Sequence, residues 1–155
     1  MLRMEEVVGR LLTGQHKTIA CAESCTGGLL TSRLTDVPGS SAYVMGSVVC
    51  YTNAVKERLA GVRHETLMAH TEISAETAGE MAEGIRKIIG TDVGVGITGL
   101  AGPGSNAGLV YIAVCGAQGT VVRENHFRGG RCEIKQKSAE TALQMIHDYL
   151  SGGNF

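Results

Sequence analysis

The thirty residues from position 93 to position 122 contain no charged side chain and eight glycines. A run of this length is long enough to cross a membrane as a helix, but its glycines, Pro103 and several Ser, Thr and Asn residues divide it into short pieces. We therefore predict buried strands over residues 93–98 and 109–115 with a loop between them. A third strand over residues 120–127 follows a Gly-containing turn and would form a hairpin with the second.

The rest of the chain alternates between apolar runs and helical patterns. Apolar residues recur at helical spacing from Met4 to Leu12, from Ala75 to Ile89 and from Ile134 to Leu150. Shorter helices are expected over residues 26–34 and 53–59, with Asn53 as the cap of the second and Gly61 as its end. Strands are expected over residues 18–22 and 43–51. Uniformly apolar strands between amphipathic helices predict an α/β fold whose sheet is covered on both faces, and the hairpin makes that sheet mixed.

Length and charge narrow the function classes. A chain of 155 residues with 43% hydrophobic residues predicts one globular domain over residues 1–155. The net charge of −1 and the six aromatic residues argue against a nucleic-acid partner. The N-terminus carries acidic residues where an export signal would be apolar, so we expect a cytoplasmic protein with no membrane partner. The five cysteines are then expected to be reduced thiols.

The first candidate site is the segment ESCTGG, residues 23–28, where a buried strand passes into a helix. Ligands of open α/β sheets bind at such strand ends, and a helix start with free N–H groups favours a phosphate. Gly27 and Gly28 would let a ligand approach the backbone. The alternative is an ordinary helix cap made by Ser24 or Thr26. Cys25 is either a thiol nucleophile or, as we favour, a small buried residue.

The second candidate site combines the turn GSS at residues 39–41 with Tyr51, Asn53 and Lys56. A helix N-terminus disfavours an ammonium group, so a dry site there would help Lys56 to lose its proton and act as a base. A serine–lysine pair is a known nucleophile–base arrangement. The alternative is a turn serine and a surface lysine, since fifteen residues separate Ser41 from Lys56.

The third candidate is GVGITG, residues 94–99, which matches a dinucleotide-binding spacing but is followed by LAGPG and not by a helix. We interpret Gly94 and Gly96 as strand positions that allow close packing. The loop over residues 99–105 is either an anion or ribose site or a plain turn. The histidines and cysteines lack metal-ligand spacing, so no metal site is expected.

Four segments in this order, ACAESCTGGLL, DVPGSSAYVMGSVVCYTNAVKERLAGV, ISAETAGEMAEGIR and GVGITGLAGP, resemble the C-terminal domain of the competence/damage-inducible CinA proteins. That family includes the stand-alone nicotinamide-nucleotide amidases called PncC. The resemblance covers residues 7–150. It implies a three-layer α/β/α sandwich with a mixed sheet, a homodimer and, because the longer CinA proteins carry a further N-terminal domain, the stand-alone form.

The resemblance also implies deamidation of nicotinamide mononucleotide, a pyridine nucleotide, to nicotinic acid mononucleotide and ammonia, with no cofactor and no metal. Its nucleophilic serine falls on Ser41 and its base on Lys56, with Tyr51 and Ser24 orienting that base or relaying its proton. The oxyanion is expected at backbone N–H groups of residues 39–41. The expected substrate-binding residues are Thr26, Gly27, Gly28, Thr98, Gly99, Gly102 and Arg131. One departure from the family pattern is Lys135, which stands where the family tends to have a second arginine.

Overall fold

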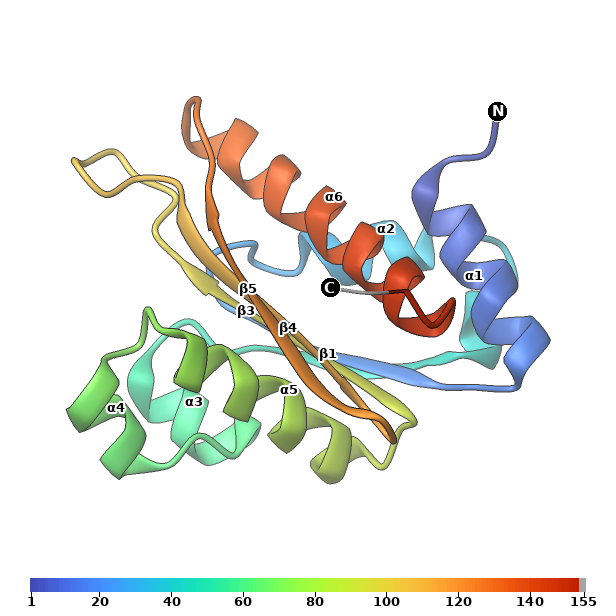
Figure 1. Cartoon of the computed structure of the whole chain (residues 1–155), viewed down its shortest axis with the longest axis horizontal. Helices are drawn as coiled ribbons and strands as arrows, with labels where there is room; N and C mark the ends of the chain where they lie inside the picture. The colour runs from blue at the N-terminus through green and yellow to red at the C-terminus, as the bar shows by residue number, and fades with distance from the viewer. Residues whose placement is uncertain (154–155) are drawn as a thin grey trace.

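The computed structural model describes residues 1–153 and contains one five-stranded sheet with helices on both sides (Figure 1). In chain order the elements are α1 (Met4–Gln15), β1 (Ile19–Glu23), α2 (Leu29–Thr35), the 3-10 turn η1 (Ser40–Ala42), β2 (Val44–Val49), α3 (Asn53–Ala60), α4 (His64–His70), α5 (Ala75–Ile89), β3 (Val93–Gly99), β4 (Leu109–Gly116), β5 (Gly119–His126) and α6 (Arg131–Leu150).

The strands are ordered β2-β1-β3-β4-β5. β1 pairs in parallel with both β2 and β3, whereas β3–β4 and β4–β5 are antiparallel. Helices α1, α2 and α6 cover one face of the sheet, and α3, α4 and α5 cover the other (Figure 1). These observations confirm the predicted α/β/α sandwich, its mixed sheet and the terminal hairpin.

The uncharged stretch begins with β3, the central strand of the sheet, and its small residues allow α5 to lie close to this strand. A Cβ atom at Gly94 would clash with the Ala82 carbonyl, and one at Gly96 would clash with the Ala78 carbonyl. Both glycines are therefore the close-packed strand positions that the sequence predicted. β1 is buried along its whole length, as expected for a strand that is covered on both faces.

Several element boundaries differ from the prediction for local reasons. Residues 26–28 form a turn, and α2 begins only at Leu29, because Gly27 and Gly28 have positive φ angles of 61° and 100°. The α3 cap is Thr52, whose hydroxyl accepts a hydrogen bond from the Val55 N–H at 3.3 Å. The seven-residue helix α4 is too short to leave a clear periodic pattern, and the sequence did not predict it.

The connections place the carboxyl ends of the three parallel strands at one edge of the sheet. From β1 the chain passes through α2 on one face to reach β2, and from β2 it passes through α3, α4 and α5 on the other face to reach β3 (Figure 1). β1 lies between these two strands. Because the two connections run on opposite faces of the sheet, they leave a crevice outside the carboxyl end of β1, and ligands of open α/β sheets bind in such crevices.

Candidate functional site

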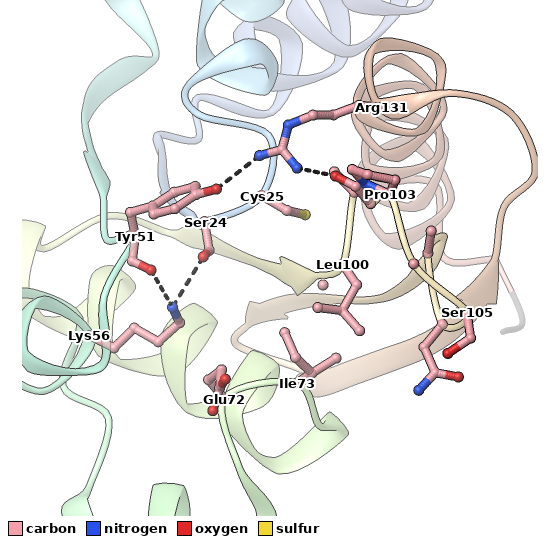
Figure 2. A pocket seen from close by; sticks show the side chains of 16 residues that line it. Ser24, Cys25, Tyr51, Lys56, Glu72, Ile73, Leu100, Pro103, Ser105 and Arg131 are labelled. Atoms are coloured by element: carbon pink, nitrogen blue, oxygen red, sulfur yellow. Dashed lines mark hydrogen bonds between the residues drawn. The ribbon is translucent and has the colours of Figure 1, made fainter.

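A cleft of about 470 Å³ lies at that carboxyl edge, between the ends of β1, β2 and β3. Residues from five parts of the chain line it (Figure 2). They are Ser24, Cys25, Tyr51, Lys56, Glu72, Ile73, Arg131 and the loop Gly99, Leu100, Ala101, Gly102, Pro103, Gly104, Ser105, Asn106 and Ala107. The cleft therefore combines the end of the first candidate segment, the lysine of the second and the loop of the third.

Lys56 is the most unusual residue of the cleft, because its side chain is only 1% exposed. Its Nζ lies 3.1 Å from Ser24 Oγ, 3.0 Å from the Cys50 carbonyl oxygen and 3.5 Å from the Tyr51 carbonyl oxygen. Among residues 1–153, no carboxylate forms an ion pair with it. A buried lysine without a counter-ion is costly to keep charged.

Burial lowers the pKa of the Lys56 ammonium group below its ordinary value, and the opposing effects of Cys50, Glu72 and Cys25 are smaller. Nζ donates to the Ser24 hydroxyl oxygen and to the carbonyl oxygens of Cys50 and Tyr51. Once the amine has lost its extra proton, two N–H groups can keep the carbonyl contacts while the nitrogen lone pair accepts the Ser24 hydroxyl proton. An amine and a hydroxyl in this relation form a base–nucleophile pair of the kind found in serine–lysine hydrolases.

Ser24 is fixed by the sheet, since its N–H donates to the Ile97 carbonyl at 3.0 Å and so ties the end of β1 to β3. It is 6% exposed and reaches the cleft. The sequence assigned Ser24 only a supporting role next to Lys56. In the structure it is the serine whose hydroxyl contacts the amine directly (Figure 2).

The expected contact between Ser41 and Lys56 is not found in this chain. Ser41 is exposed and lies in η1, immediately before β2, whereas Lys56 follows the other end of that strand. The six residues of β2 between them correspond to about 20 Å of extended chain. Ser41 and the N–H groups of residues 39–41 are accordingly at the amino edge of the sheet, away from the cleft. Within one chain, therefore, the predicted pairing of Ser41 with Lys56 and the predicted position of the oxyanion site at residues 39–41 are wrong.

The segment that was expected to bind phosphate instead surrounds a buried carboxylate. Glu23 is fully buried, and it accepts hydrogen bonds from the N–H groups of Leu30 and Thr31, both at 2.9 Å. The hydroxyls of Thr26 and Thr31 each donate to it at 2.6 Å. The first free amides of α2 are therefore already used by the protein itself, which corrects the prediction of a phosphate at this helix start.

The other predicted contacts of that segment also lie away from the cleft. Thr26 is buried against Glu23, and neither Gly27 nor Gly28 lines the cleft. A Cβ atom at Gly27 would lie 3.8 Å from Lys135 Nζ, so the residue that departs from the family pattern lies beside this turn.

Tyr51 and Arg131 close the mouth of the cleft on one side (Figure 2). The Arg131 guanidinium donates to the Tyr51 hydroxyl at 2.9 Å and to the Gly102 carbonyl oxygen. Arg131 is the first residue of α6, so this helix connects β2 and the loop after β3 across the opening. Tyr51 does not contact Lys56 through its hydroxyl; only its carbonyl oxygen is near Nζ. Of the predicted binding residues, Gly99, Gly102 and Arg131 therefore line the cleft.

Thr98 is fully buried and does not line the cleft, but its hydroxyl donates to the Glu72 carbonyl oxygen at 2.6 Å. It thus positions Glu72, which lines the cleft outside every predicted site, as do Ile73, Asn106 and Ala107. In the sequence, Glu72 and Ile73 are marked only by their position just before Ser74, the cap of α5. Their proximity to Lys56 depends on packing between distant segments, which spacing does not reveal.

Cys25 lines the cleft beside Ser24, but its chemistry differs from that of a reactive thiol. Burial raises the pKa of the Cys25 thiol to about 11. The residue is 6% exposed and packs in the main core cluster. The structure thus favours the small buried residue over the thiol nucleophile.

Within residues 1–153, no helix is long and apolar enough to cross a membrane. In the same part of the chain, no three His, Cys, Asp or Glu side chains are grouped so that they could hold a metal ion.

Comparison with known sequences identifies relatives of this chain. It is 46% identical over 154 residues to a protein of Desulforamulus reducens that is named for competence-damage induction, and 43% identical over 155 residues to a CinA-like protein of Thermotoga maritima. Each alignment covers 97% of this chain but only 38% of the relative. The chain therefore spans about two fifths of the length of these curated relatives.

Solved structures agree with this relationship. A competence/damage inducible protein from Agrobacterium tumefaciens is 36% identical, with a TM-score of 0.89 over 96% of this chain and 95% of that one. A CinA superfamily protein from Klebsiella pneumoniae is 28% identical, with a TM-score of 0.91 over 97% of this chain and 99% of the other. The family model for the CinA C-terminal domain matches residues 1–150. The chain thus belongs to the CinA C-terminal domain family.

Proposed function

We propose that this chain is an amidohydrolase that converts nicotinamide mononucleotide to nicotinic acid mononucleotide and ammonia, with Ser24 as nucleophile and Lys56 as base. The observation that carries the proposal is the buried, unpaired amine of Lys56, 3.1 Å from Ser24 Oγ at a cleft. The choice of substrate follows from the resemblance to the nicotinamide-nucleotide amidases. The choice of nucleophile follows from the geometry and replaces Ser41.

In the first step, neutral Lys56 takes the proton from the Ser24 hydroxyl while Oγ attacks the carboxamide carbon. The C=O electron pair moves to oxygen and forms a tetrahedral oxyanion. The backbone N–H of Cys25, which follows Ser24 and lines the cleft, has no backbone hydrogen-bond acceptor within residues 1–153 and is the candidate donor to this oxyanion. Such preorganised donors stabilise the charge that develops in the transition state.

In the second step, the oxyanion collapses and the C–N bond breaks. The protonated amine of Lys56 gives its proton to the leaving nitrogen, so ammonia departs and an ester to Ser24 remains. Water then attacks the ester carbon while Lys56 takes a proton from it, and the returning proton restores the Ser24 hydroxyl. One amine thus serves as base and as acid in both halves of the reaction.

The remaining cleft residues suit the sugar phosphate. Arg131 uses two of its nitrogens for Tyr51 and Gly102, which leaves other N–H donors of the guanidinium for a phosphate at the mouth. The backbone of the loop from Gly99 to Ser105 offers polar groups to the ribose. Lys135 lies beside the Gly27 turn and adds positive charge there, although a lysine cannot hold phosphate in a bidentate manner.

An ammonia-release assay with nicotinamide, its riboside, its mononucleotide and the dinucleotide tests this proposal. We expect the mononucleotide to be hydrolysed faster than nicotinamide and its riboside, because Arg131 can pair with its phosphate. Binding of the mononucleotide without ammonia release would instead favour a non-catalytic nucleotide-binding domain. The absence of both binding and release would refute the proposal.

A further inference from the structure

Glu72 is the only acidic residue among those that line the cleft. Its side chain is half-buried, yet within residues 1–153 its carboxylate has neither a hydrogen-bond donor nor an ion-pair partner. Figure 2 shows it on the side of the cleft opposite Arg131. A cleft carboxylate whose oxygens are not used by the protein can accept hydrogen bonds from a ligand.

The backbone around Glu72 is held firmly in place. Its carbonyl accepts the Thr98 hydroxyl at 2.6 Å, and the Thr71 carbonyl accepts the Thr77 hydroxyl at 2.7 Å. Thr71 itself has φ 68° and ψ 176°, a region that is almost restricted to glycine. Strain of this kind persists only where the surrounding contacts enforce it, and it is concentrated at functional sites. Here it directs the residue that follows, Glu72, towards the cleft.

Glu72 also faces the reacting groups. Its charge acts on the Lys56 amine, but the two side chains do not form an ion pair within 4.0 Å. Both line the same cleft together with Ser24. A carboxamide whose carbon is positioned against Ser24 Oγ would therefore have its nitrogen on the side of Lys56 and Glu72.

The substrate and the product of an amide hydrolysis differ at that nitrogen. An amide NH₂ donates two hydrogen bonds, whereas the carboxylate of the product only accepts them and carries a negative charge. A fixed carboxylate on the protein therefore attracts the NH₂ group of the substrate and repels the carboxylate of the product. A site that pairs with an NH group discriminates strongly against an analogue that lacks it.

We propose that Glu72 is the specificity-determining residue that selects the carboxamide over the carboxylate: it accepts a hydrogen bond from the substrate NH₂ and disfavours the acid formed by hydrolysis. This inference rests on the proposed function, since it takes a pyridine carboxamide as the substrate. It assigns two effects to one side chain, which are orientation of the leaving nitrogen and expulsion of the product.

Binding measurements on a protein that cannot turn over test this inference. In the Ser24→Ala background, titration calorimetry gives the Kd of nicotinamide mononucleotide and of nicotinic acid mononucleotide. We expect the amide to bind at least about tenfold more tightly than the acid. Adding Glu72→Gln keeps the size of the side chain, removes its charge and supplies an NH₂ donor, so the acid should gain about tenfold in affinity while the amide changes by less than about threefold.

Glu76→Gln is the matched control, because it removes a nearby negative charge that does not line the cleft. It should leave the ratio of the two Kd values unchanged. If the amide binds and Glu72→Gln leaves the ratio unchanged as well, the role of Glu72 is refuted while the proposed function stands. If neither nucleotide binds to the Ser24→Ala protein, the proposed function and this inference both fail.

Discussion

The two edges of the sheet present the same residue type in opposite settings. At the carboxyl edge, Ser24 is 6% exposed and contacts a buried amine. At the amino edge, Ser41 is exposed in the 3-10 turn before β2, and its hydroxyl makes no hydrogen bond within residues 1–153. The difference teaches that a serine becomes a candidate nucleophile through the base that it contacts and not through an exposed position after a turn.

The reason for the difference lies in the topology. Three parallel strands end at the carboxyl edge, so their loops converge there and bring polar groups from distant parts of the chain to one cleft. The amino edge receives helix ends and the η1 turn. A single strand, β2, is enough to hold Ser41 and Lys56 at opposite edges.

The largest expected effect comes from exchanging each of the two serines for alanine. Ser24→Ala should lower kcat for ammonia release by about a thousandfold or more, because it removes the nucleophile. Ser41→Ala should change kcat by less than about twofold, as expected for a surface substitution. Steady-state assays with nicotinamide mononucleotide measure both. An inactive Ser41→Ala protein next to an active Ser24→Ala protein would reverse the comparison between the two edges.

The same contrast shows how far the sequence alone could lead. Apolar periodicity and glycine placement predicted the sandwich, the mixed sheet and nearly every element, since these depend on local patterns. The sequence also indicated that Lys56, near the start of a helix, could act as a base if its site were dry, with a surface lysine as the alternative. It paired Lys56 with the wrong serine, because a spacing of fifteen residues does not show that a whole strand lies between the two residues.

Glu23 illustrates a second limit. The residue ends an apolar strand and was not considered as a buried group, yet its carboxylate takes the amides that were expected to bind phosphate. A sequence reveals that a helix start has free N–H groups, but it does not reveal which acceptor fills them. Glu72 was missed for a related reason, since only the contact from Thr98 brings it to the cleft.

The second prediction concerns the base. Because burial lowers the pKa of Lys56 and the mechanism needs the neutral amine, kcat/KM should rise with pH and level off below the ordinary lysine pKa of 10.5. Lys56→Arg keeps a cation that cannot be deprotonated, and it should lose about a thousandfold in rate. A pH profile of the wild-type enzyme and a single-pH assay of the variant measure these effects. An active Lys56→Arg protein would reduce Lys56 to an electrostatic contact.

The lowered pKa also has a consequence for stability. A lysine whose pKa is lower in the folded state binds fewer protons there than in the unfolded chain, so stability rises with pH between the lowered pKa and 10.5. Lys56→Met removes this cost and should stabilise the protein by about 1 kcal/mol at neutral pH. The difference between the two proteins should shrink as the pH approaches 10.5 in denaturant unfolding experiments. A difference that does not vary with pH would contradict the assignment.

The smallest expected effect compares the two non-glycine residues that have positive φ within residues 1–153, one at each edge of the sheet. His16 ends α1 near the amino edge with φ 55° and ψ 42°, within the left-handed region that L residues tolerate. Thr71 precedes Glu72 at the carboxyl edge in a region that is almost restricted to glycine. Thr71→Gly should therefore stabilise the fold more than His16→Gly. The expected difference is about 1 kcal/mol, or about 2–4 °C in Tm. This figure allows for the hydrogen bond from the Ile73 N–H to the Thr71 hydroxyl, which the substitution removes. Thermal unfolding of both variants measures this order. A larger gain in stability from His16→Gly would show that the backbone of Thr71 is not strained, and that strain at Thr71 does not direct Glu72 towards the cleft.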